Sequence, residues 1–247
     1  MAQHDHKVAF ISGANRGIGL ETARKLGELG IAVVLGVRDL DKGAAAVREL
    51  QAAGIRAEAI RYDAADDDAA EAVHRHLEQH YGKLDILVNN AGILRESLLG
   101  PTSSSTVSQQ VLRETFQVNL FAVIALTQRL LPLLRLAPAG RIVNLSSIVG
   151  SLTLHSLPDS PIAPVKSVAY DASKSALNAY TIHLAHELRD TPIKVNSAHP
   201  GWVKTELGGE HAPMDLADSW KTSVRLATLE ANGPSGGFYH EADALPW

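Results

Sequence analysis

Residues 8–19 read VAFISGANRGIG, a short apolar run that leads directly into a turn containing Gly13, Gly17 and Gly19. The apolar run is uncharged and bounded by glycine, which predicts a buried strand. Gly13 permits a tight turn, and Gly19 allows the following helix to pack closely on the strand. The chain therefore begins with a strand, a glycine turn and a helix, the opening unit of a parallel α/β sheet.

The same alternation of short apolar runs and longer amphipathic stretches continues along the whole chain. Strands are predicted near Val8–Ser12, Ala32–Val37, Arg56–Tyr62, Ile86–Asn89, Arg141–Leu145, Lys194–Ala198 and Gly237–His240. Helices are predicted to start near Gly17, Asp41, Asp66, Ser105, Ser167 and Asp215. Right-handed crossovers place helices on both faces of a parallel sheet. The pattern thus predicts one α/β domain over residues 1–247, a Rossmann-type doubly wound parallel sheet of about seven strands.

The composition is that of an ordinary soluble globular protein, with 45% hydrophobic and 20% charged residues. A formal charge of -4 argues against a nucleic-acid partner. The absence of cysteine excludes disulfides, thiol chemistry and cysteine-ligated metal sites. The first residues lack an apolar signal core, and the apolar run Leu120–Leu126 is far shorter than the ~20 residues that span a bilayer. We expect a cytoplasmic protein without nucleic-acid or membrane partners.

The glycine turn also predicts a phosphate site. Exposed amides at a helix N-terminus bind phosphate groups, and Gly17 would let the backbone approach a pyrophosphate closely. A structural turn is the alternative, but its place in the first strand–helix unit favours dinucleotide binding. The residues expected to contact the dinucleotide here are Gly13, Asn15, Arg16, Gly17, Ile18 and Gly19.

Arg38 follows the second predicted strand, where the adenine ribose of a dinucleotide is expected. A carboxylate there selects NAD, whereas a basic residue admits the 2′-phosphate of NADP. Asp39 has a spacing close to that of NAD-binding chains, but Asp39 or Asp41 suits helix capping just as well. We therefore predict NADP(H) rather than NAD(H), with Arg38 and Arg16 pairing the phosphate. Two solvated arginines are the alternative.

Polar and small residues end the third and fourth predicted strands. Asp63 could accept a hydrogen bond from the adenine amine, or it could cap the acidic helix start near Asp66. Asn90, Ala91 and Gly92 follow the fourth strand, where small residues let the backbone face a cofactor closely. Asp63, Asn90, Ala91 and Gly92 are therefore further candidate cofactor contacts.

Tyr170 and Lys174 lie four residues apart, on one face of a predicted helix. A neighbouring ammonium favours a phenolate, so such a pair can exchange a proton with a carbonyl or alcohol oxygen. Ser146 and Ser147 end the fifth predicted strand at the same sheet edge, where a hydroxyl can orient the substrate oxygen. Asn119 is a polar residue on a largely apolar helix, and a buried amide there needs a partner.

Taken in order, these residues closely resemble the classical short-chain dehydrogenase/reductase family over almost the whole chain. The resemblance implies that Tyr170 is the catalytic acid/base and that Lys174 lowers its pKa and binds the nicotinamide ribose. It further implies that Ser147 orients the carbonyl, leaving Ser146 structural, and that Asn119 holds a water in the proton relay.

The resemblance also covers Pro200-Gly201-Trp202-Val203-Lys204-Thr205. It implies that this segment binds the nicotinamide end of the cofactor, with Pro200, Gly201, Val203 and Thr205 as contacts. The Asn15-Arg16-Gly17 core, Arg38 and the closing Gly233–Gly237 stretch look most like the NADPH-dependent carbonyl reductases. The implied activity is reversible reduction of ketones and aldehydes to alcohols with NADP(H).

Two features depart from the family pattern. Ser147 and Tyr170 are 23 residues apart, with a Pro-rich segment at Ser151–Lys166 that could cover the substrate or obstruct subunit contacts. The stretch after Thr205 is short, so the usual helical lid looks reduced. Leu94, Leu98, Leu152, Leu154 and Trp202 suggest an apolar pocket. A homo-oligomer, dimer or tetramer, is expected, and a monomer is the alternative.

The sequence disfavours other classes of enzyme and leaves two alternatives open. A serine hydrolase is disfavoured because the chain lacks a G-x-S-x-G elbow. Helical histidines such as His76 and His80 lack a completing ligand, so no metal is expected. An NAD(H)-preferring secondary-alcohol dehydrogenase and a non-catalytic NADP-binding redox sensor are the alternatives to an NADPH-dependent reductase.

Overall fold

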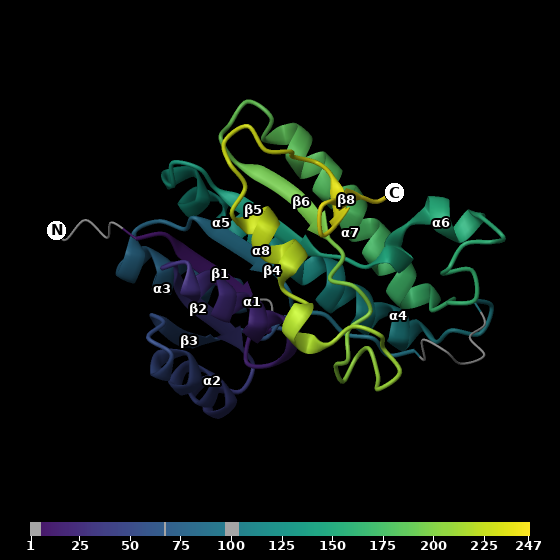
Figure 1. Cartoon of the computed structure of the whole chain (residues 1–247), viewed down its shortest axis with the longest axis horizontal. Helices are drawn as coiled ribbons and strands as arrows, with labels where there is room; N and C mark the ends of the chain where they lie inside the picture. The colour runs from purple at the N-terminus through teal and green to yellow at the C-terminus, as the bar shows by residue number, and fades with distance from the viewer. Residues whose placement is uncertain (1–5, 67, 97–103) are drawn as a thin grey trace.

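The computed structural model describes residues 6–66, 68–96 and 104–247. Its strands form one sheet in the order β3-β2-β1-β4-β5-β6-β7-β8, and every pairing except the last is parallel (Figure 1). The strands are β1 (Val8–Ser12), β2 (Ala32–Val37), β3 (Ala57–Arg61), β4 (Ile86–Asn89), β5 (Arg141–Leu145), β6 (Lys194–Ala198), β7 (Phe238–His240) and β8 (Asp243–Ala244). The strand order reverses between β1 and β4, which is where ligands bind in such sheets.

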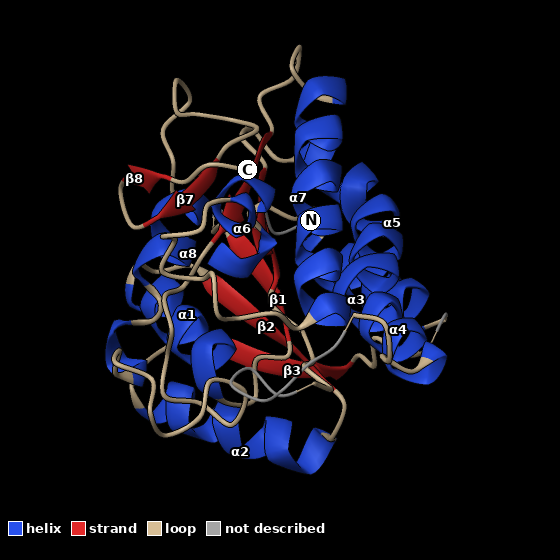
Figure 2. Cartoon of the chain, turned by 90° about the vertical axis from the view of Figure 1, so that its right-hand side faces the viewer, coloured by secondary structure: helices blue, strands red, loops and turns tan. Residues whose placement is uncertain are grey.

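Helices cover both faces of this sheet, as Figure 2 shows from the side. They are α1 (Gly17–Glu28), α2 (Leu40–Ala52), α3 (Ala69–Tyr81), α4 (Gln109–Phe116), α5 (Ala122–Leu136), α6 (Leu152–Ser156), α7 (Val168–Glu187) and α8 (Lys221–Ala227). Short turns add a π-helix, η1 (Gln117–Phe121), and two 3-10 helices, η2 (Ile148–Gly150) and η3 (Leu216–Asp218).

The two faces bury two separate apolar cores. Val8 and Phe10 of β1 pack with α3, α5 and α7, whereas Ala9 and Ile11 of the same strand pack with α1, α2 and α8. Successive side chains of a strand point to opposite faces, so an uninterrupted apolar run is what a strand covered on both sides requires. The predicted doubly wound single-domain α/β fold is therefore confirmed.

The seven predicted strands are confirmed to within one residue at their ends. The structure adds β8, which pairs antiparallel with β7 through Tyr239 and Ala244. Sequence periodicity missed this strand because two residues are too few to show alternation. The sheet of the described residues therefore has eight strands rather than seven.

Several helix starts differ from the predictions because the capping residues differ. The helix predicted near Ser105 begins at Gln109, since the Ser108 hydroxyl accepts the Val111 N–H at 3.1 Å. The helix predicted near Asp215 is preceded by η3 and begins at Lys221. These shifts leave the order of elements unchanged.

The stretch Gln109–Leu136 is helical throughout and includes the π-turn η1. By length and composition alone it could cross a membrane, but half of its most apolar window is buried inside the protein. Leu126, Leu130 and Leu134 belong to the core under the sheet. The apolar character of this stretch thus reflects its packing on the sheet.

Candidate active site

A cavity of about 1070 Å³ lies at the carboxyl ends of the central strands. All of the residues predicted to bind a dinucleotide line it. They are Gly13, Asn15, Arg16, Gly17, Ile18, Gly19, Arg38, Asp63, Asn90, Ala91, Gly92, Tyr170, Lys174, Pro200, Gly201, Val203 and Thr205. Ser147 lines the same cavity, whereas Asn119 is fully buried behind its wall.

Hydrogen bonds from Asn90 hold the glycine turn against the end of β4. The Asn90 amide donates to the Ser12 and Gly13 carbonyls at 2.7 and 3.1 Å, and its backbone N–H donates to the Ser12 hydroxyl at 3.0 Å. A Cβ on Gly19 would lie only 2.5 Å from that amide and 2.8 Å from the Gly13 carbonyl oxygen. Gly13 and Gly17 have φ values of +67° and +60°, which favour glycine. Backbone geometry therefore requires glycine at these positions.

The two candidate phosphate arginines differ in their partners. Arg16 forms an ion pair with Glu206, from the segment that follows Thr205. Arg38 is exposed and makes no hydrogen bond or ion pair with any residue that the structure describes. Asp39 is the N-cap of α2, where its carboxylate accepts the N–H groups of Asp41 and Lys42 at 3.0 and 3.2 Å. Of the two uses that the sequence left open for Asp39, the structure shows helix capping.

Tyr170, Ser147 and Lys174 meet at the surface of the cavity. Tyr170 and Lys174 are buried on successive turns of α7, and the Lys174 ammonium lies 5.6 Å from the centre of the tyrosine ring. The ammonium donates to the Leu145 carbonyl at 2.8 Å, and the Ser147 side chain hydrogen-bonds the phenol. The helix period brings the first pair together, while the end of β5 supplies the serine.

Burial dominates the electrostatics of this group. It raises the pKa of Tyr170 well above its ordinary value, the Asp171 carboxylate adds to the rise, and the Ser147 hydrogen bond opposes it. Burial lowers the pKa of Lys174 to about 8. Lys174 is not among the causes of the shift at Tyr170, so the lowering of the Tyr170 pKa by Lys174 that the resemblance implies stays a prediction. Tyr170 is a neutral phenol at neutral pH.

The side chain of Asn119 forms hydrogen bonds within the protein. Its carbonyl oxygen accepts the Ile93 N–H at 2.8 Å, and its amide donates to the Ile93 carbonyl at 2.9 Å and to the Ser173 hydroxyl at 3.0 Å. Both hydrogens of the amide are thus used within the protein. The side chain ties the loop after β4 to α7 and has no donor left for a water of a proton relay.

The structure adds residues that the sequence did not indicate. His199 lines the cavity, and its Nδ1 accepts the Ile148 N–H at 3.2 Å. Burial and the nearby His240 lower the pKa of His199 to about 3, so the imidazole is neutral. Its position directly before Pro200-Gly201 was the signal that could have identified it.

The apolar lining includes part of the predicted set. Val149, Ile162, Val165, Trp202 and Leu207 line the cavity. Of the predicted residues, Trp202 lines the cavity, Leu94 and Leu154 pack against the cluster of Val149, Ile162 and Tyr170, Leu152 is exposed at 68%, and Leu98 lies outside the described residues. The Pro-rich segment adds Ile162 and Val165, which the sequence did not indicate.

Comparison with known proteins identifies the family. The family model for short chain dehydrogenases matches residues 7–215. The chain belongs to the short-chain dehydrogenases. It is therefore an oxidoreductase acting between CH–OH and C=O groups.

Several reductases of this family resemble the chain along its whole length. The NADPH carbonyl reductase 1 of Homo sapiens is 32% identical, over 97% of this chain and 98% of the relative. The structure of an NADPH-bound carbonyl reductase from chicken fatty liver matches with a TM-score of 0.85 and 25% identity, covering 98% and 99% of the two chains. Salutaridine reductase of Papaver somniferum matches with a TM-score of 0.83 and 29% identity, covering 95% and 99%.

The cavity of this short-chain dehydrogenase fits a dinucleotide on its own geometry. A Cβ on Gly17 would meet nothing within 4 Å, so the turn leaves open space where a phosphate would approach. The buried Ser146 hydroxyl also lines the cavity and has no hydrogen-bond partner in the part of the chain that the structure describes. A phosphorylated ligand would provide hydrogen-bond partners for the Ser146 hydroxyl, for Arg38 and for the amides of the glycine turn.

Asp171, next to Tyr170, makes stability depend on pH. Burial raises the pKa of its carboxyl group from 3.8 to about 7, with Glu96 contributing to the rise. The folded protein therefore retains a proton that the unfolded chain loses between these values. The contribution of this group to stability is full below about pH 4 and is lost as the pH rises through 7.

We expect Asp171→Asn to gain stability relative to the wild type by up to about 4 kcal/mol between pH 4 and pH 8, at 1.36 kcal/mol per pKa unit. Urea unfolding of both proteins at pH 4, 6 and 8 measures the change. Asp190→Asn, at a carboxylate whose side chain is 84% exposed, is the matched control. A difference between Asp171→Asn and wild type that stays constant with pH would contradict the assignment.

Proposed function

We propose that this short-chain dehydrogenase reduces ketones and aldehydes to alcohols, reversibly, with NADPH as the reductant. The observation that carries the proposal is the meeting of Tyr170, Ser147 and Lys174 in the cavity that is also lined by the glycine turn and Arg38. Reduction of a carbonyl group needs three groups near its oxygen: a general acid, a hydrogen-bond donor and an ammonium.

Protonation of the carbonyl oxygen falls to Tyr170. Because burial keeps the phenol protonated at neutral pH, it can donate its proton to an oxygen that gains negative charge. Ser147 would hold that oxygen against the phenol, and Lys174 places a positive charge nearby. The reverse reaction requires a phenolate, which burial disfavours, so the electrostatics favour reduction.

The cofactor preference rests on the adenosine side of the cavity. Bound NADPH would supply a hydride to the carbonyl carbon. Arg38 is free to pair a 2′-phosphate, whereas the carboxylate of Asp39, the group that NAD would use, is engaged at the N-terminus of α2. Arg38 and the glycine turn would hold the phosphates, and Lys174 would hold the nicotinamide ribose. NADPH-bound relatives agree with this preference.

The substrate end of the cavity is apolar. Ile162, Val165 and Val149 lie beside Tyr170 in one apolar cluster. Contact with such a wall is favourable for apolar substrate surface, which it removes from water. We propose bulky aliphatic or aromatic ketones and aldehydes as the substrate class.

The test is the loss of reduced-nicotinamide absorbance when NADPH or NADH is mixed with a panel of aromatic ketones, aldehydes and diketones. Consumption that is selective for NADPH is the expected result. Faster turnover with NADH would instead favour the NAD-dependent alcohol dehydrogenase. NADPH binding without turnover across the panel, and without alcohol oxidation by NADP, would favour a redox sensor.

Location and assembly complete the proposal. We propose a cytoplasmic enzyme that associates through α5 and α7, the helices that follow Asn119 and carry Tyr170. Phe121, the last residue of η1 directly before α5, and Ile182 of α7 are exposed apolar side chains, at 53% and 40%. Light scattering on the purified protein measures its mass directly; a mass of one chain would support a monomer.

A further inference from the structure

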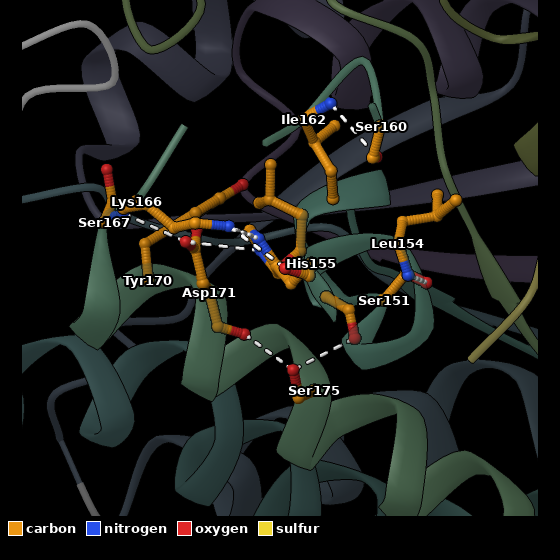
Figure 3. A network of polar contacts seen from close by, with 12 residues as sticks. Ser151, Leu154, His155, Ser160, Ile162, Lys166, Ser167, Tyr170, Asp171 and Ser175 are labelled. Atoms are coloured by element: carbon orange, nitrogen blue, oxygen red, sulfur yellow. Dashed lines mark hydrogen bonds and ion pairs between the residues drawn. The ribbon is translucent and has the colours of Figure 1, made fainter. Parts of the chain in front are cut away.

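The Pro-rich segment 151–166 forms part of the cavity beside Tyr170. It contains α6 and a series of turns, and its residues Pro161, Ile162 and Val165 line the cavity. Ile162 is 5% exposed and packs in one cluster with Val149 and Tyr170. This segment, here called the 151–166 wall, therefore lines the cavity next to Tyr170, and Figure 3 shows its polar contacts.

Most hydrogen bonds of the wall do not reach the rest of the protein. The Val165 N–H donates to the Ile162 carbonyl at 3.0 Å, and the Ala163 N–H donates to the Ser160 carbonyl at 2.9 Å. Such local turns shape a segment but do not fix where it lies. Its position requires contacts to other elements.

His155 of α6 makes such contacts. Its Nε2 lies 2.8 Å from the Val149 carbonyl and 3.5 Å from the Asp171 carboxylate, and its Nδ1 lies 2.7 Å from the Lys166 ammonium (Figure 3). An ammonium can only donate, so Nδ1 accepts and Nε2 carries the hydrogen. The neutral imidazole thus donates its N–H to the Val149 carbonyl, with the Asp171 carboxylate 3.5 Å away, and burial lowers the pKa of the imidazole and keeps it neutral.

Asp171 lies beside His155 on the first turn of α7. Its Oδ2 accepts the Ser167 N–H at 3.0 Å, while Oδ1 has no partner among the residues that the structure describes. The neighbouring Tyr170 N–H donates to Glu96 at 2.9 Å, so two carboxylates bind the free N–H groups of this turn. The carboxylate that meets His155 is therefore fixed to the turn that carries Tyr170.

We propose that His155 is a positioning residue whose hydrogen bond to the Val149 carbonyl, beside the Asp171 carboxylate, holds the 151–166 wall against Tyr170, so that Ile162 and Val165 contact large carbonyl substrates. His155 sets substrate preference and takes no part in proton transfer. The inference rests on the proposed reduction of carbonyl compounds for its substrate. The anchoring of the wall can be measured without any substrate.

The test compares His155→Ala, His155→Gln and Ile162→Ala, with His183→Ala at an exposed histidine of α7 as the matched control. For His155→Ala we expect the KM of a bulky aromatic ketone to rise about tenfold, since one or two methylene contacts are worth 10- to 200-fold in discrimination. The kcat, the KM of a small aldehyde and the Kd of NADPH should stay within about twofold. His155→Gln should recover most of the loss.

A double-mutant cycle separates positioning from a general structural effect. If His155 acts through the wall, His155→Ala and Ile162→Ala together should raise the KM no more than the larger single change. Additive effects would overturn the proposed route through Ile162.

Hydrogen exchange of the backbone amides tests the anchoring alone. In His155→Ala the amides of residues 151–166 should exchange at least tenfold faster, with little change in α5 and none in the control. Unchanged exchange overturns the anchoring role. A wild-type protein that binds NADPH yet reduces no carbonyl compound overturns the proposed function, while the exchange result still decides whether His155 holds the wall.

Discussion

Tyr170→Phe is expected to lower kcat/KM for carbonyl reduction by about 10³-fold, the size of a general-acid contribution. The variant removes the buried phenolic hydroxyl beside Ser147, and it leaves the ring that packs against Val149 and Ile162. The fold and the Kd of NADPH should therefore be nearly unchanged. Steady-state kinetics and NADPH fluorescence titration measure the two effects.

Tyr180→Phe is the matched control because Tyr180 lies on the same helix and its hydroxyl bonds Thr127 rather than the cavity. It should keep kcat/KM within about twofold. Normal turnover by Tyr170→Phe would remove Tyr170 from the chemistry and leave Ser147 or His199 as the proton donor to examine.

Arg38→Ala is expected to raise the Kd of NADPH by about 10- to 100-fold and to leave the Kd of NADH within threefold. A hydrogen bond to a charged group is worth about 1.5 to 3 kcal/mol, and 1.4 kcal/mol corresponds to tenfold in affinity. Arg38 makes no competing contact with the described residues, so its full pairing energy is free for the phosphate. Isothermal titration with both cofactors measures the difference.

Arg16→Ala should have a smaller effect, because Arg16 must first give up its ion pair with Glu206. Arg48→Ala, at an exposed arginine of α2, controls for the loss of one positive charge. Equal losses for NADPH and NADH in Arg38→Ala would show that this side chain does not read the 2′-phosphate.

Some features of the site depend only on residues that are close together in the sequence. Tyr170 and Lys174 share a helix face whatever the rest of the fold does, because the helix period places residues four apart together. The glycine turn is equally local, since the φ values of Gly13 and Gly17 belong to the turn itself. Both features could be predicted, and so could the order of strands and helices that brings them to one sheet edge.

Properties that depend on distant partners could not be predicted. The pKa of Tyr170 rises because the folded chain buries it, although the sequence next to it suggested the opposite. Asn119 meets Ile93 and Ser173, and His155 meets Asp171, across tens of residues or between separate elements. No spacing in the sequence specifies these pairs.

The sequence by itself thus determined the alternating α/β fold, the glycine turn and the residue types of the candidate site, because periodicity and backbone preference act between near neighbours. The tertiary structure alone decided which of those residues are buried, which are charged and which are paired with another side chain. Asp39 caps α2, Arg16 pairs with Glu206, and Arg38 is left free. Desolvation and pairing arise from contacts made only when separate elements pack together, so they could be read only from the folded chain.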